Sequence, residues 1–169
     1  MKQLKIYTIT GITFVLIIGS ISHFFYEWSG NNFLIGLFSP VNESTWEHMK
    51  LLFFPMLLYS FIMILKLRSD YPCVTFACLT GILLGTLLIP VIFYTYTGII
   101  GHNLLALDIG TFAVSVIISF YTIYRLTLTC NMPARTFMLY VLVCLLAAFF
   151  MVFSYFPPDL PLFLVPHMT

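Results

Sequence analysis

Charged residues are scarce in this chain. They make up 8% of its 169 residues, against about 25% in a typical soluble domain. Because hydrophobic residues make up 61% of the chain, we exclude an ordinary soluble domain and predict an integral membrane protein. The net charge is +1 and no basic run is present, which excludes nucleic acid as a partner. The length suits one compact helical domain, residues 1–169, without an added soluble domain.

The chain also lacks the short motifs of familiar metal sites. It contains neither a Cys-x-x-Cys pair nor a His-Glu-x-x-His motif. Its four cysteines lie within or beside apolar segments, where we expect small buried side chains rather than metal ligands or disulfides. Any metal site would therefore have to be assembled from residues that are distant in the sequence.

Long apolar stretches dominate what is present. Five of them approach or exceed the roughly 20 residues that a helix needs to cross a membrane, and they cover residues 6–26, 46–65, 72–94, 104–124 and 134–156. We therefore predict an all-α membrane protein, a bundle of five transmembrane helices. The first stretch is taken as an uncleaved span rather than a signal peptide. Residues 33–38 are too short to span and are predicted to form a short interfacial or re-entrant segment. Residues 157–169 are predicted to form a proline-rich outer tail.

Basic residues flank these predicted spans on a single side. They precede the first span, join the second to the third, and flank the turn between the fourth and fifth: Lys2, Lys5, Lys66, Arg68, Arg125 and Arg135. Loops rich in Lys and Arg stay on the cytoplasmic side of a membrane. We therefore predict a multi-pass protein with a cytoplasmic N-terminus and an extracytoplasmic C-terminus.

Acidic residues and histidines gather toward the opposite, outer side. Acidic residues could simply fill outer loops once the basic residues are kept inside. That explanation does not cover His23, Glu27, His48 and Asp108, which map within the predicted helices. Ionisable groups in a membrane are energetically costly and usually mark function, so we predict a polar site at the outer face.

Polar side chains also follow two helix faces. At 100° per residue, one face of the first span holds Thr13, Ser20, His23 and Glu27. One face of the fourth span holds Asp108, Thr111, Ser115, Ser119 and Thr122. Small hydroxyl residues on one face often only pack helix against helix in membrane bundles, so these faces indicate either packing or a polar path. The Gly81-x-x-x-Gly85 motif predicts a close approach between two helices.

The segment from Ser39 to Lys50 carries an unusual density of ionisable residues at the start of the second span. Ser44 fits the N-cap of a capping box, in which Glu47 would reach back to the cap. Alternatively, Ser39 caps the helix and Pro40 is its first residue. Glu47 and Lys50 are spaced for an i,i+3 salt bridge.

Our first functional hypothesis is a membrane-embedded site for a divalent metal, such as zinc, that hydrolyses a lipid-like or outer-leaflet substrate. Histidine nitrogens and a carboxylate can hold zinc while leaving a position for water. The predicted metal ligands are His23, His48, His102 and Asp108. The predicted general bases are Glu43 and Glu47, and the predicted supporting or binding residues are Glu27, Asn42, Lys50 and Asn103.

Two alternatives stay open at this stage. In a small transporter, channel or substrate-binding subunit, Glu27 and Asp108 would relay protons or cations along the hydroxyl faces. In a scaffold, the ionisable residues would only pair with one another. The expected partners are membrane lipids and a small-molecule or lipid substrate, with a homo-oligomer left open.

Three segments resemble a known family. These are His-Phe-Phe-Tyr-Glu-Trp at residues 23–28, Pro-Val-Asn-Glu-Ser-Thr-Trp-Glu-His at residues 40–48, and Pro-Pro-Asp-Leu-Pro-Leu-Phe at residues 157–163. The chain is similar there to a bacterial family of small integral membrane proteins of unknown function. The resemblance implies a bacterial cytoplasmic membrane and a shared outer-face site.

Overall fold

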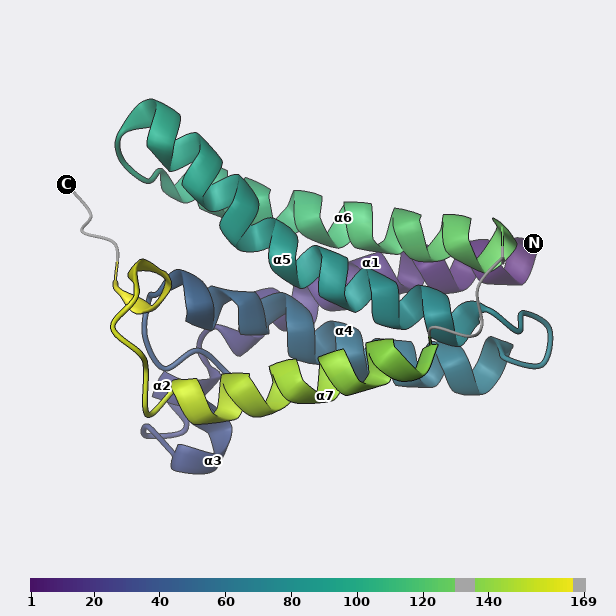
Figure 1. Cartoon of the computed structure of the whole chain (residues 1–169), viewed down its shortest axis with the longest axis horizontal. Helices are drawn as coiled ribbons and strands as arrows, with labels where there is room; N and C mark the ends of the chain where they lie inside the picture. The colour runs from purple at the N-terminus through teal and green to yellow at the C-terminus, as the bar shows by residue number, and fades with distance from the viewer. Residues whose placement is uncertain (130–135, 166–169) are drawn as a thin grey trace.

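The computed structural model describes residues 1–129 and 136–165, and the described residues form helices without a strand. Five helices are long and apolar enough to cross a membrane, so the predicted fold class is confirmed. They are α1 (Lys2–Ser22), α4 (Thr45–Leu67), α5 (Val74–Ile100), α6 (Leu105–Thr129) and α7 (Thr136–Phe153) (Figure 1). Of the predicted features, Arg135 and residues 166–169 of the tail lie outside the described residues.

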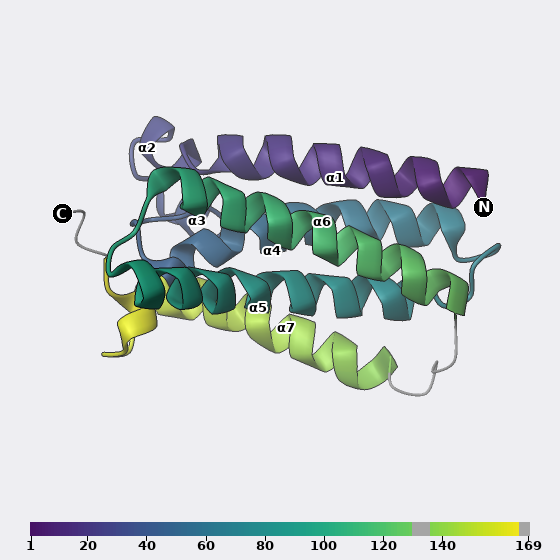
Figure 2. The same cartoon turned by 90° about the horizontal axis from the view of Figure 1, so that it is seen from above.

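Helix α4 forms the centre of the bundle. It supplies more of the buried core than any other described helix, including Leu52, Phe53, Met56 and Met63. The other long helices surround it, with α1 and α7 on opposite sides (Figure 2). Helix α7 buries little of itself and turns most of its apolar side chains outward. The apolar exterior of the bundle suits a lipid environment, where exposed hydrophobic side chains need no protein cover.

Glycines set the distance between neighbouring helices. A Cβ atom added at Gly19 of α1 would lie 2.5 Å from the carbonyl oxygen of Leu51 in α4. A Cβ atom at Gly81 of α5 would lie 3.1 Å from the Ser119 carbonyl oxygen, and one at Gly85 would collide with the Ser119 side chain. The predicted close approach at Gly81 and Gly85 is therefore confirmed, and α6 is the partner helix.

The polar face predicted for the first span differs from the packed face. Thr13 and Ser20 are exposed on the outside of the bundle, and the Thr13 hydroxyl donates to the Ile9 carbonyl at 3.2 Å. The buried positions are Leu4, Gly11, Val15, Gly19 and Ser22. The glycines on this face let α1 lie close to α4 and α6. The face with Thr13 and Ser20 therefore points away from the packed side of α1.

The first span also ends earlier than residue 26. Helix α1 stops at Ser22, and a turn leads into the short helix α2 (Phe25–Trp28), where the Phe24 amide donates to the Ile21 carbonyl at 3.1 Å. His23 and Glu27 therefore do not lie on one continuous helix. The short helix α3 (Phe33–Gly36) follows, where the sequence predicts a short interfacial segment.

Helix α4 begins as the Ser44 cap predicts. The Glu47 amide donates to Ser44 Oγ at 3.4 Å, so the alternative start at Ser39 is wrong. Glu47 does not reach back to the Ser44 amide, because Asn42 Oδ1 already accepts from that amide at 2.9 Å. The Glu47 carboxylate accepts instead from the Val41 amide at 2.9 Å.

The predicted salt bridge between Glu47 and Lys50 is present and fully buried. Lys50 Nζ lies 2.8 Å from Glu47 Oε2 and donates to the carbonyl oxygens of Gly36 at 2.8 Å and Ser39 at 3.1 Å. Ser154 Oγ donates to Glu47 Oε1 at 2.7 Å. The pair therefore joins the segment around α3, the start of α4 and the end of α7.

The expectation for the cysteines holds only in part. Cys78 is a buried free thiol and Cys144 an exposed one, whereas Cys73 is disulfide-bonded. Spacing along the chain does not reveal which thiols the fold brings together, so a sequence without a Cys-x-x-Cys pair could not show this. Cys130 lies outside the described residues.

Candidate functional site

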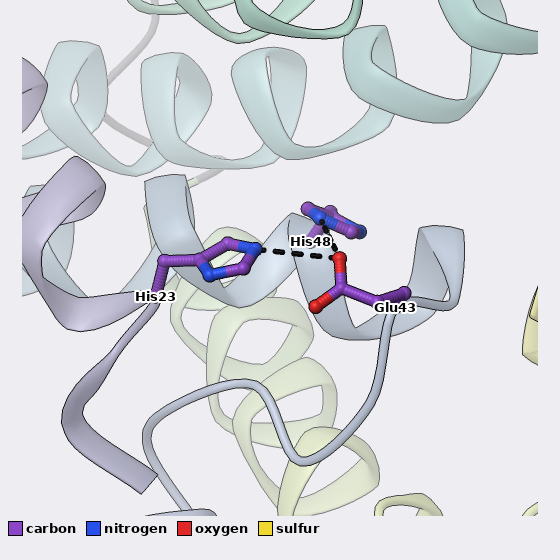
Figure 3. Close-up of side chains that lie close together, drawn as sticks. All are labelled: His23, Glu43 and His48. Atoms are coloured by element: carbon purple, nitrogen blue, oxygen red, sulfur yellow. Dashed lines mark ion pairs between the residues drawn. The ribbon is translucent and has the colours of Figure 1, made fainter. Parts of the chain in front are cut away.

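Three ionisable side chains meet at the end of the bundle where α1 stops and α4 begins. His23 follows the last residue of α1, Glu43 precedes the Ser44 cap, and His48 lies in the first turn of α4. The distance to Glu43 Oε2 is 3.4 Å from His23 Nε2 and 3.3 Å from His48 Nε2. Both imidazoles point toward the same carboxylate (Figure 3). Within the described residues, one potential ligand atom from each of the three lies within 4.8 Å of the others.

A backbone carbonyl fixes the orientation of the His48 ring. His48 Nδ1 lies 2.9 Å from the Ser44 carbonyl oxygen, which can only accept a hydrogen bond, so Nδ1 carries a proton. In the neutral imidazole Nε2 is then without a proton. Nε2 and Glu43 Oε2 would be two acceptors facing each other at 3.3 Å, so a proton or another cation must lie between them.

The two histidines also act on the charge of Glu43. The hydrogen bond with His48 is the largest cause that lowers the pKa of the Glu43 carboxyl below its ordinary value, and His23 adds to the shift. Partial burial acts in the opposite direction. Glu43 is therefore a carboxylate at neutral pH, as a metal ligand or a proton acceptor has to be.

A cavity of about 410 Å³ opens beside this cluster. His23, Glu43 and His48 line it together with Asp108 of α6 and Asn103. The remaining lining is mainly apolar and comes from α4, α5, α6, the α5–α6 connection and the tail, including Leu51, Ile89, Phe93, Leu104, Leu105, Phe112 and Val165. The C-terminal part of α5 slopes away from α4 in Figure 1. The ionisable cluster thus borders a largely apolar space of small-molecule size.

A second pocket of about 370 Å³ lies on the other side of the same cluster. It shares His23 and Glu43 with the first cavity, and its further polar lining residues are Glu27, Asn31 and Asn42. His23 and Glu43 therefore stand between an apolar cavity and a polar pocket.

Asp108 is held in place by two neighbours. The Tyr96 hydroxyl donates to Asp108 Oδ1, and Asn103 Nδ2 donates to Asp108 Oδ2 at 3.4 Å. Tyr96 is the residue that the sequence did not single out, because it was expected in a loop. Helix α5 extends to Ile100, and this additional length brings the Tyr96 hydroxyl to Asp108.

Several predicted site residues lie elsewhere. His102 is exposed and is not part of the ionisable cluster. Glu47 is buried and bonded to Lys50, Val41 and Ser154. The helix turns about 100° per residue, so His48 faces the cavity while Glu47 faces the other way. Neither His102 nor Glu47 therefore belongs to the candidate site.

The hydroxyls of the predicted polar face on α6 are engaged in helix packing. Ser115 and Ser119 are fully buried, and each donates to the carbonyl four residues earlier, at 2.7 Å and 2.6 Å. Ser119 also packs against Gly85 of α5. This arrangement favours helix packing over a polar path for transport.

The described residues thus form a multi-pass membrane bundle with a His/Glu group at one end. The chain matches a family of unknown function, DUF6512, over residues 1–167, and it belongs to that family. No curated protein and no solved structure matches the chain.

Proposed function

We propose that His23, Glu43 and His48 bind a divalent metal ion, with zinc as the first candidate, and that the site hydrolyses a lipid-like substrate held in the adjoining cavity. The observation that supports the proposal is the convergence of these three side chains on the wall of that cavity. We place the site at the extracytoplasmic face, as the basic loops predict.

The two distances from Glu43 to the histidines suit tetrahedral zinc. Zinc lies about 2.0–2.2 Å from nitrogen and oxygen ligands, so neighbouring ligands of a tetrahedral ion are about 3.3–3.5 Å apart. The two distances to Glu43 Oε2, 3.4 Å from His23 and 3.3 Å from His48, equal such edges. Two histidines and one carboxylate are also the ligand set of several zinc hydrolases, which keep a fourth position for water.

The Ser44 carbonyl adds a second argument. Metal-binding histidines usually donate their other ring N–H to a carbonyl or carboxylate, which fixes the tautomer. His48 Nδ1 has such a partner at 2.9 Å, and Nε2 then presents a lone pair toward the cluster. A protonated His48 would account for the same distances without a metal, so metal analysis has to separate the two explanations.

Hydrolysis at this site needs few further groups. The metal would polarise the substrate carbonyl and make water a stronger nucleophile. The water oxygen bonds to the carbonyl carbon, the bond from that carbon to the leaving oxygen or nitrogen breaks, and the proton lost by water passes to the leaving group. Both ion pairs of Glu43 use Oε2, so Oε1 is the atom to which we assign this proton transfer.

Metal analysis of the purified protein tests the proposal. After equilibration with zinc and removal of free metal, we expect about one ion per chain, and we expect the His48→Ala variant to lose it. The His102→Ala variant is the matched control, because His102 is exposed and outside the cluster. Absence of bound metal from the unmodified protein, or equal metal in the two variants, would refute the metal site.

Activity is tested separately on the metal-loaded protein. Single-chain fatty esters and amides are incubated with it in lipid nanodiscs, and the released fatty acid is measured by mass spectrometry. We expect release by the unmodified protein and its loss in Glu43→Gln. Metal binding without release of any fatty acid would support the metal site and refute the hydrolase activity.

A further inference from the structure

The described residues that line the two pockets include acidic side chains together with the cluster histidines His23 and His48. Glu43 and Asp108 line the apolar cavity, and Glu27 and Glu43 line the polar pocket. No Lys or Arg is among the described residues that line either space. Proteins that recognise phosphate usually provide Arg or Lys for its charge. These walls therefore disfavour an anionic head group.

Lys50, close to His48 in the sequence, does not supply the missing positive charge to these pockets. Its side chain is fully buried, and its ammonium group already faces three acceptors, namely Glu47 Oε2 and the carbonyls of Gly36 and Ser39. An ammonium group has three protons to donate, so none remains for a ligand.

Asp108 offers the opposite kind of contact. It accepts one hydrogen bond at each oxygen, from Tyr96 and from Asn103. Two carboxylate oxygens have about four acceptor positions, which leaves room for a hydroxyl or ammonium donor. Asp108 lies on the wall of a mainly apolar cavity, where a charge–donor contact is stronger than in water.

The volume and lining of the cavity indicate the kind of apolar chain that is attached to such a head group. About 410 Å³ is near the lower end of the range of roughly 300–1,000 Å³ for small-molecule sites, which suits one apolar chain better than two. Leu51, Phe93, Leu105 and Phe112 provide an apolar wall for it. The polar pocket beyond His23 and Glu43 is a place for the more hydrophilic end of the ligand.

We infer that the cavity takes a single-chain amphiphile whose head group is neutral or cationic and carries hydroxyl or ammonium donors, and that it rejects amphiphiles with a phosphate head. This amphiphile is the substrate class of the site only if the proposed hydrolase function is correct, so the inference rests on that function. Asp108 is the specificity-determining residue, because it is the charged group on the cavity wall outside the cluster.

Binding of three probes with the same chain tests the inference. The probes are dodecyl phosphate, N-dodecylethanolamine and monolauroylglycerol, titrated calorimetrically into the protein in zwitterionic nanodiscs, with empty nanodiscs subtracted. A chelator is present throughout, so that phosphate cannot bind through a metal ion. We expect N-dodecylethanolamine to bind at least about tenfold more tightly than dodecyl phosphate, since complementary charge sets specificity at such a site.

Two variants identify the residue responsible. In Asp108→Asn we expect the preference for the amine to fall to about threefold or less. Monolauroylglycerol should lose much less affinity than the amine, because the asparagine carbonyl still accepts from a hydroxyl, and its continued binding shows that the cavity is intact. In Asp159→Asn, which removes an exposed carboxylate at the same end, the preference should persist. Equal or tighter binding of dodecyl phosphate, or an undiminished preference in Asp108→Asn, would overturn the inference.

The outcome is separable from that of the metal experiment. The titrations use metal-free protein and require no turnover, so the preference is measured whether or not a metal binds. A protein that binds no zinc but prefers the amine would disprove the hydrolase and retain the cavity's selectivity. A protein that binds zinc but prefers dodecyl phosphate would retain the metal site and disprove the cavity's selectivity.

Discussion

Lys50 Nζ and Glu47 Oε2 lie 2.8 Å apart, and their side chains are 0% and 1% exposed to solvent. The pair lies in the first two turns of α4, where Glu47 points about 100° away from its neighbour His48 around the helix axis. It binds the Val41 amide and the carbonyls of Gly36 and Ser39, and these residues belong to the segment that leads to Glu43. The buried ion pair therefore fixes the backbone that presents one of the three candidate ligands.

The first prediction concerns this pair. The Lys50→Met variant leaves the Glu47 carboxylate buried without its cation, which typically costs about 3–5 kcal/mol of stability. We expect a clear loss of thermal stability in detergent, measured by circular dichroism. Lys66→Met is the matched control, because Lys66 is exposed at the other end of the same helix.

A double variant checks the cause of that loss. Glu47→Gln together with Lys50→Met removes both charges, and replacement of a buried pair by uncharged residues is often nearly neutral. The double variant should therefore be more stable than Lys50→Met alone. Equal melting temperatures for Lys50→Met and Lys66→Met would contradict the structural role of the pair.

The second prediction connects helix packing with the site. In the Gly19→Ala variant the new Cβ atom would lie 2.5 Å from the Leu51 carbonyl oxygen, so α1 has to move away from α4. His23 follows about one turn later, directly after the last residue of α1, and its ring should move with the helix. We expect zinc affinity to fall at least about tenfold, the scale seen when the support of a ligand is disturbed.

Gly110→Ala provides the comparison for this variant. Gly110 lies in α6, and a Cβ atom added there meets no atom within 4 Å. The same substitution should therefore leave zinc affinity unchanged. If Gly19→Ala and Gly110→Ala bound zinc equally well, the close contact between α1 and α4 would not position His23.

The third prediction is the direction of the pH dependence. The folded-state pKa of Glu43 is below its ordinary value, so ionised Glu43 stabilises the fold above its unfolded-state pKa. That contribution is lost only as the pH falls through the lowered folded-state value. Glu43 thus stays ionised from about pH 5.5 to 7.5, whereas protons compete with metal for imidazole nitrogens. We expect zinc affinity to rise with pH over this range.

Zinc titrations at three pH values measure this dependence. In Glu43→Gln we expect weaker binding at every pH but a similar rise, because the two histidines remain. Affinity that is independent of pH, or that falls as the pH rises, would indicate that the histidines do not bind the metal.

The sequence predicted the features that one helix determines alone. Five apolar stretches of membrane length became five long helices, because length and apolar composition are local properties. The i,i+3 spacing of Glu47 and Lys50 predicted their salt bridge. The Ser44 cap follows from the same kind of local chemistry.

The features that were missed depend on how helices meet. Thr13 and Ser20 suggested a packed polar face, yet Gly11 and Gly19 carry the contacts of α1. The sequence predicted His102 as a metal ligand beside His23 and His48, and Glu43 as a general base. Only the packing of α1 beside α4 brings His23 to Glu43 and leaves His102 exposed. Such choices rest on tertiary contacts that spacing along one chain does not encode.

The last prediction concerns the tail that follows α7. The ring of Phe163, in the 3-10 turn η2 (Pro161–Phe163), lies 4.9 Å from the ring of Trp46, which is 7% exposed. Two residues later Val165 lines the apolar cavity. Phe163 therefore holds the tail against α4 and keeps Val165 in the cavity wall. In Phe163→Ala we expect Trp46 to become accessible to solvent and the cavity to lose part of that wall.

Fluorescence of Trp46 measures this change once the other tryptophan is removed. Trp28 is 69% exposed, so the measurement uses a Trp28→Phe background in which Trp46 is the only tryptophan. Phe163→Ala should shift the emission to longer wavelength and increase quenching by acrylamide, because burial excludes both water and quencher. Phe156→Ala, which removes a ring that is 78% exposed, should do neither. Identical emission from the two variants would mean that the tail does not cover Trp46, and Val165 would then have no anchor at the cavity.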